Sequence, residues 1–106
     1  MEKTLNFTVD GKDYKLAFTR NTVVATENMG FVIADVYKKP IGMIQILWRG
    51  AFLANHNTLT IAEVDDLFDK IDKEGLMDAL LELYRAPVES LFDEDNEKNA
   101  VKWTIN

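Results

Sequence analysis

The sequence predicts an α+β fold, mostly α, in which an N-terminal β-hairpin packs on a small bundle of four to five helices. Two alternating apolar runs flank Asp10-Gly11, an apolar run occupies residues 41–54, and helical periodicity continues to about residue 92. A chain of 106 residues with 47% hydrophobic residues can bury a core of its own. We therefore expect a single domain over residues 1–106, divided into a hairpin (about 4–18), helices (about 20–92) and an acidic C-terminal tail (about 93–106).

The hairpin is indicated by alternation on both sides of Asp10-Gly11. Asp-Gly between two period-two runs is a strong short-range hairpin signal. A two-stranded hairpin is marginal alone, so its apolar face must pack on the rest of the chain. The alternating apolar residues are Leu5, Phe7 and Val9 in the first run, and Tyr14, Leu16 and Phe18 in the second.

The stretch Pro40–Asn57 is predicted to be the central helix. Between Ile41 and Ala54 only Gln45 and Arg49 are strongly polar, and a helix that is apolar almost all round must be buried. A membrane span needs roughly 20 apolar residues, and this run is shorter and carries a charge. Proline suits the first helical turn. We expect four of its side chains to be buried: Ile44, Leu47, Trp48 and Phe52.

Two further helices have recognisable starts. Thr19 can cap a helix that includes Val23, Val24 and Glu27 and ends at Gly30. Thr60 and Glu63 form a capping box, and the helix that follows should end near residues 73–75. Its apolar face comprises Ile61, Val64, Leu67, Phe68 and Ile71.

Three segments leave alternatives open. Residues 31–37 fit a strand or a buried helical turn, and we favour a short helix that stops before Pro40. A last helix opens at Leu76, and Pro87 either kinks it or starts a further short helix. The alternating residues Val101, Trp103 and Ile105 form either a third strand or an apolar tail that needs a partner.

Charge is unevenly distributed along the chain. The net charge is −6, with +2 over residues 1–60 and −8 over residues 61–106. An acidic half argues against nucleic-acid binding, which needs clustered Lys and Arg. It is either a solvated face or a docking surface for a basic partner. The N-terminus has neither signal-peptide nor transit-peptide character, so we expect a cytoplasmic protein without membrane contacts.

No residue pattern points to catalysis, a cofactor or a metal. The chain has no cysteine, and its one serine stands in no nucleophile motif. His56 is expected to cap the end of the central helix. Asp65, Asp69 and Asp72 share one face at helical spacing, but like charges there are expected to be solvated. Residues 93–97 lack the glycine and the glutamate of a calcium loop. We therefore expect a protein that is not an enzyme.

Two segments resemble the tail assembly chaperones of long-tailed phages or prophages of Gram-positive bacteria. One is the opening hairpin FTVDGKDYKLAFTR, residues 7–20, with the helix that follows it to Gly30. The other is ILWRGAFLANHNTLTIAEVDDLFDKI, residues 46–71, in which an aromatic and alanine-containing helix runs into an Asn/His-rich turn. The resemblance covers roughly the first seventy residues and consists of apolar positions and turns.

The resemblance implies a non-enzymatic role. Such chaperones bind the tape measure protein before and during polymerisation of the tail tube, and are often made in two lengths by programmed frameshifting. The tail tube protein is a further expected partner, and self-association stays open. The rival hypothesis is a small acidic inhibitor or adaptor, for example one that mimics DNA. We expect partner binding at six residues: Asp65, Asp69, Asp72, Val101, Trp103 and Ile105.

Overall fold

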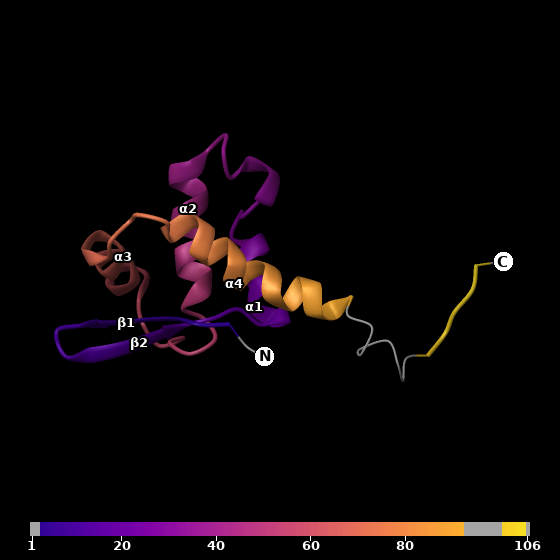
Figure 1. Cartoon of the computed structure of the whole chain (residues 1–106), viewed down its shortest axis with the longest axis horizontal. Helices are drawn as coiled ribbons and strands as arrows, with labels where there is room; N and C mark the ends of the chain where they lie inside the picture. The colour runs from indigo at the N-terminus through magenta and orange to yellow at the C-terminus, as the bar shows by residue number, and fades with distance from the viewer. Residues whose placement is uncertain (1–2, 93–100, 106) are drawn as a thin grey trace.

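The fold is α+β, as predicted, in a computed structural model that describes residues 3–92 and 101–105. An antiparallel hairpin is followed by four α-helices and one short 3₁₀ turn (Figure 1). No helix in the described ranges is both long and apolar enough to cross a membrane. Of the acidic tail expected at about 93–106, residues 93–100 and 106 lie outside the described residues. The elements are β1 (Leu5–Val9), β2 (Lys12–Leu16), α1 (Arg20–Asn28), η1 (Ile33–Asp35), α2 (Pro40–Ala51), α3 (Ile61–Lys70) and α4 (Leu76–Leu91).

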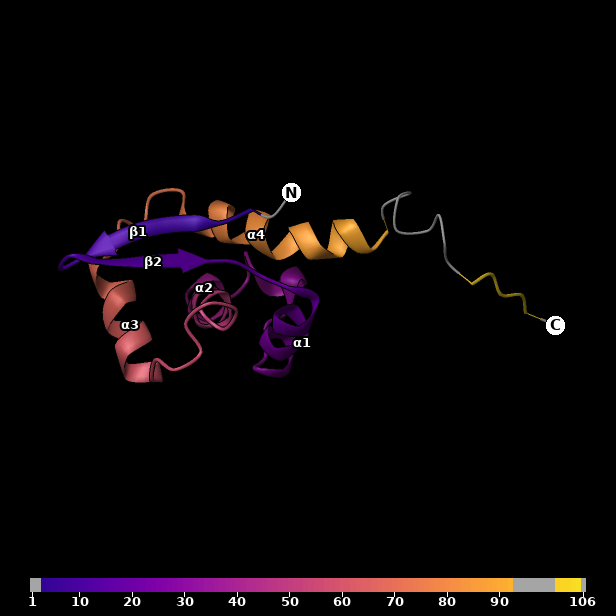
Figure 2. The ribbon, with the colours of Figure 1, turned by 90° about the horizontal axis from the view of Figure 1, so that it is seen from below.

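The hairpin forms at the predicted turn. Asp10 and Gly11 have positive φ angles of 52° and 77°, the left-handed geometry that a two-residue hairpin turn requires. Val9 pairs with Lys12, and the register continues to Leu5 opposite Leu16. Figure 2 shows β2 next to the end of α2 and β1 on the far side of β2. The apolar side chains of β2 are consequently buried, whereas those of β1 are only half-buried.

α2 is the central helix, as expected. Leu47, Trp48 and Ala51 have no exposed surface, and the indole Nε1 of Trp48 donates to the carbonyl oxygen of Val64 at 2.8 Å. This bond satisfies the polar atom of the largest core side chain. Phe52 is also buried, but the prediction for Ile44 is wrong, because its side chain is only partly covered.

The predicted end of the central helix at Asn57 is also wrong. α2 ends at Ala51, and the amides of Phe52 and Leu53 bond three residues back, to the carbonyls of Arg49 and Gly50. Such tightened bonds close the last turn of a helix. The chain then turns towards the hairpin, which the sequence pattern did not indicate.

α1 begins at the predicted cap and lies very close to α2. The side chain of Thr19 accepts from the amide of Thr22, and Gly30 follows the helix with a φ of 108°. A Cβ atom on Gly50 would stand 2.0 Å from Oγ1 of Thr26. Only glycine permits this approach of the two helices. In residues 31–37, the favoured short helix is one 3₁₀ turn, η1.

α3 opens with the predicted capping box. The hydroxyl of Thr60 accepts from the amide of Glu63, and the carboxylate of Glu63 accepts from the amide of Thr60. The expected end near residues 73–75 is wrong, because α3 ends at Lys70 and Ile71 is extended. Ile61 was expected on the buried face but is 63% exposed, because it borders a hollow between α2 and α3 instead of the core.

α4 is one helix with Pro87 inside it, so Pro87 does not start a separate helix. Its missing N–H leaves the carbonyl of Leu83 without its usual helical donor, which is tolerated near a helix end. Leu76, Leu80 and Leu81 are buried, while Leu91 is 43% exposed. The final turn of α4 therefore extends past the core.

Candidate functional site

The three aspartates predicted to bind a partner do not share one helix face. Asp65 and Asp69 belong to α3, but Asp72 lies beyond its end, where its Oδ1 accepts from the amide of Glu74 at 3.1 Å. The helix stops early because Ile71 turns extended to lead into the loop before α4. A shared face would require one continuous helix from Asp65 to Asp72, so the prediction of that face is wrong.

Asp65 is engaged within the fold. Arg49 of α2 donates from Nε to Oδ1 at 3.0 Å and from Nη2 to Oδ2 at 2.7 Å. This bidentate pair holds the pKa of the Asp65 carboxyl below its ordinary value and raises the pKa of Arg49. Its neighbour Asp66 pairs with Lys70 at 3.1 Å. Two of the α3 carboxylates thus belong to ion pairs, while Asp69 is exposed.

The apolar C-terminal segment is extended and exposed. Val101, Trp103 and Ile105 are 91%, 79% and 86% exposed, and Figure 1 shows the segment apart from the helices and the hairpin. Of the two alternatives that the sequence left open, the structure has no third strand among the described residues. Because removal of apolar surface from water is favourable, binding of a partner that covers these three side chains would be stabilised.

A groove between α1 and the end of α4 is lined almost entirely by apolar side chains. It encloses about 280 Å³ and is lined by Val23, Val24, Pro87, Val88 and Leu91, with Arg20 at its edge. Val24, Val88 and Leu91 are 40–54% exposed, and Phe92 beyond them is 73% exposed. Sequence reasoning missed this groove, although apolar residues continuing past Pro87 were a signal for it.

A second hollow lies between α2 and the start of α3. It encloses about 390 Å³, and the guanidinium of Arg49 is one of its few polar groups. Ile61, which the sequence assigned to the core, lines it instead. The other lining residues are Met29, Ile46, Phe52, Leu53, His56, Asn57, Leu59 and Val64.

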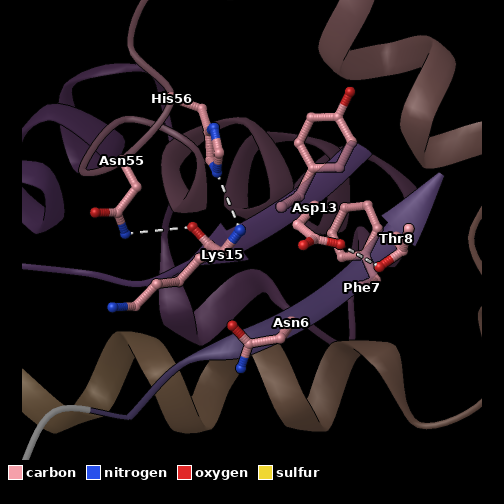
Figure 3. A pocket seen from close by; sticks show the side chains of 8 residues that line it. Asn6, Phe7, Thr8, Asp13, Lys15, Asn55 and His56 are labelled. Carbon is pink, nitrogen blue, oxygen red and sulfur yellow. Dashed lines mark hydrogen bonds between the residues drawn. The ribbon is translucent and has the colours of Figure 1, made fainter. Parts of the chain in front are cut away.

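Asn55 and His56 cover the outer edge of β2. The amide of Lys15 donates to Nε2 of His56 at 3.0 Å, and the Nδ2 of Asn55 donates to the carbonyl of Lys15 at 3.2 Å (Figure 3). His56 was expected to cap the end of the central helix, which is wrong because that helix ends before it. These groups also line a surface hollow of about 390 Å³.

The described residues contain no group of three or more His, Asp or Glu side chains placed to hold a metal ion. The strongest pKa perturbation lies inside the fold, at Tyr84. Its hydroxyl donates to Oε2 of Glu27 at 2.9 Å, and burial together with that carboxylate raises the pKa of Tyr84 to about 12. The bond ties α4 to α1 and is a structural contact.

One family profile matches residues 1–106, over their whole length, and its description is "Domain of unknown function (DUF5055)". No curated protein matches the chain. No solved structure matches it either.

Proposed function

Since the chain belongs to the DUF5055 family, whose function is unknown, we propose from its own residues that it is a non-enzymatic phage tail assembly chaperone. In this proposal it binds the tape measure protein, and the tail tube protein as a further partner, in the cytoplasm of the infected cell. The proposal rests on the resemblance of residues 7–30 and 46–71 and on one structural observation. That observation is a set of exposed apolar side chains, in the groove between α1 and α4 and on the segment Val101–Ile105.

The apolar surface has two parts. The groove between α1 and α4 offers Val24, Val88 and Leu91, and Phe92 extends it. The segment Val101–Ile105 adds three exposed apolar side chains. A chaperone needs exposed apolar groups that can cover those of its partner, and aromatic residues contribute strongly to such contacts. The groove is suited to one apolar face of a partner helix.

The acidic inhibitor is the weaker hypothesis. A protein that mimics DNA needs carboxylates exposed along an extended surface. In α3, Asp65 is held by Arg49 and Asp66 by Lys70. These pairs cancel part of the local negative charge. A contribution of the acidic half to solubility and to the rate of association therefore falls to its exposed carboxylates, such as Asp69.

The test is co-expression with the tape measure protein of the same genome, followed by pull-down and measurement of the soluble fraction. Wild type is expected to bind and solubilise it. Val88→Asp/Leu91→Asp should reduce the recovered complex at least tenfold, because both charges enter the apolar groove. Ile41→Asp is the matched control, since Ile41 is 75% exposed on the first turn of α2.

Binding that is retained in the groove variant would place the partner elsewhere on the surface. A wild-type chain that neither binds nor solubilises the tape measure protein overturns the chaperone proposal. Binding of double-stranded-DNA-binding proteins in its place would favour the acidic inhibitor.

A further inference from the structure

The two edges of the hairpin differ in whether their outward-pointing backbone groups are hydrogen-bonded. In this register Val9–Lys12, Phe7–Tyr14 and Leu5–Leu16 are the hydrogen-bonded pairs, because a two-residue turn is closed by such a pair and the types alternate. The backbone groups of the remaining residues point outward. On β2, the outward groups of Lys15 are bonded by Asn55 and His56.

The outward backbone groups of β1 have no such hydrogen-bonded cover in the described part of the chain, although α4 packs against this strand. The outward amides and carbonyls there belong to Asn6 and Thr8, both exposed, and neither backbone has an outward partner among residues 3–92 and 101–105. Their side chains bond only within the hairpin, to Thr4 and Asp13. An open edge is a template for a further strand.

The segment Val101–Ile105 matches that edge in length and pattern. β1 has five residues, and so does the segment. Its apolar residues alternate with Lys102 and Thr104. In an antiparallel register, Lys102 faces Thr8 and Thr104 faces Asn6, so that both pairs exchange two backbone hydrogen bonds.

The same register places apolar groups together on the core side. Val101 then stands beside Val9, and Trp103 beside Phe7. The ring of Phe7 already stacks on those of Tyr14 and Trp48, with centroids 5.2 and 5.7 Å apart. Trp103 would extend this aromatic row across the strands, a favourable cross-strand arrangement. One register thus satisfies the open backbone groups and covers the exposed side chains.

We propose that the C-terminal segment Val101–Ile105 of one copy adds to the β1 edge of a second copy, as a third, antiparallel strand. The segment of the same chain is poorly placed to do so. Glu82 pairs with Lys3 beside the start of β1, at 3.1 Å, and α4 continues from there away from the Asp10-Gly11 turn (Figure 1). An antiparallel segment must begin at that turn.

The distances favour a second copy. Phe92 lies ten residues beyond Glu82, about 15 Å along the helix axis. From the start of β1, beside Glu82, the strand runs about 17 Å in the opposite direction, to the turn where the added segment must begin. The eight residues between Phe92 and Val101 reach roughly 30 Å only when fully extended.

The buried area argues for reciprocal exchange. A buried aromatic side chain contributes about 150–250 Å², whereas a stable interface buries roughly 1,200–2,000 Å² in total. The area buried by one five-residue strand falls short of that range, and reciprocal exchange of two strands doubles the buried area. The expected assembly is therefore a closed dimer with two-fold symmetry.

Exchange occupies a segment that is also proposed to bind the tape measure protein, so the two interactions compete.

The first test is the mass of the full-length chain, measured by sedimentation between about 1 and 500 μM without any partner. Wild type is expected to change from monomer to dimer, and a chain ending at residue 100 to stay monomeric. Thr8→Pro should also stay monomeric, because proline removes the outward-pointing N–H donor at this position. It removes no backbone hydrogen bond to β2. Thr8→Val is the matched control, since it loses the same hydroxyl but keeps the amide, and it should dimerise.

The second test uses the absence of cysteine from the chain. Copies with Thr8→Cys alone, mixed with copies with Lys102→Cys alone, should form a disulfide-linked heterodimer, because directly opposed residues lie about 5.5 Å apart. Thr8→Cys mixed with Thr104→Cys is out of register and should link at least tenfold more slowly. A monomer at all concentrations, or linking of Thr8→Cys with Lys102→Cys that is no faster than with Thr104→Cys, overturns the proposal. Neither result bears on whether wild type binds the tape measure protein.

Discussion

The two sides of α1 differ in how they meet their neighbours. Towards α2 the contact is closed, because Thr26 has no exposed surface and fills the space above Gly50. Towards α4 it is closed where Tyr84 bonds Glu27, and it opens into an apolar groove beside Val24. One nine-residue helix therefore combines a side that fixes the fold with a side that leaves apolar surface accessible. Stability and binding can then be altered by different substitutions.

The largest expected effect is at Trp48, on the helix that closes one side of α1. Trp48→Ala should lower the free energy of unfolding by about 3–5 kcal/mol, because it leaves a cavity in the core and removes the bond to the carbonyl of Val64. Chemical denaturation followed by circular dichroism measures the change. A loss below about 1 kcal/mol would show that α2 is not the centre of the core.

Gly50→Ala tests the closed side directly. Its new Cβ would meet Oγ1, Cγ2 and Cβ of Thr26 at 2.0–2.9 Å, so α1 and α2 must separate. The expected loss of unfolding free energy is about 3 kcal/mol, at the upper end of overpacking costs. Gly42→Ala is the matched control on the same helix, where a Cβ has nothing within 4 Å. Equal melting temperatures for the two variants would contradict close packing at Gly50.

The bond between Tyr84 and Glu27 gives the partly closed side a pH dependence. Because the pKa of Tyr84 is raised from 10.0 to about 12, the folded state favours the neutral phenol. The corresponding stability is complete below about pH 10 and is lost as pH rises to about 12, by roughly 2–3 kcal/mol. The difference between wild type and Tyr84→Phe, measured by denaturation at pH 9–12, isolates this effect. A constant difference across that range would show that Tyr84 does not titrate in this way.

The smallest expected effect is on the open side. Val24→Ser should change the free energy of unfolding by less than about 0.5 kcal/mol, because Val24 is 54% exposed. The adjacent Val23, only 6% exposed, provides the control: Val23→Ser should cost about 2 kcal/mol by burying a hydroxyl in an apolar site. Similar losses at both positions would mean that the groove is part of the core.

Local patterns in the sequence were sufficient for much of the fold. The Asp10-Gly11 turn and the box of Thr60 and Glu63 depend on neighbouring residues, and both formed as predicted. The predicted ends of α2 and α3 were wrong, because each helix ends where the chain must change direction to reach the next element. The exposure of Ile61 follows from the position of α3 on the core, which its own periodicity does not contain.

The candidate site was harder to predict because it depends on contacts between distant segments. Asp65 was grouped with Asp69 by helical spacing alone, and its bond to Arg49 exists only because α2 packs against α3. The groove arises where α4 passes the start of α1, more than sixty residues earlier in the chain. Alternation at Val101, Trp103 and Ile105 left a third strand and an apolar tail open, and only the arrangement of the described elements shows that Trp103 is exposed.

The two tryptophans differ in burial, so their intrinsic fluorescence can report separately on two regions of the chain. Trp48 has no exposed surface and Trp103 is 79% exposed. Iodide in solution should therefore quench the red-shifted emission of Trp103 and leave that of Trp48 almost untouched. Loss of quenching at constant blue-shifted emission reports that the C-terminal segment has been covered, while a red shift of the protected component reports unfolding. A single unlabelled sample can thus separate docking of the segment from integrity of the core.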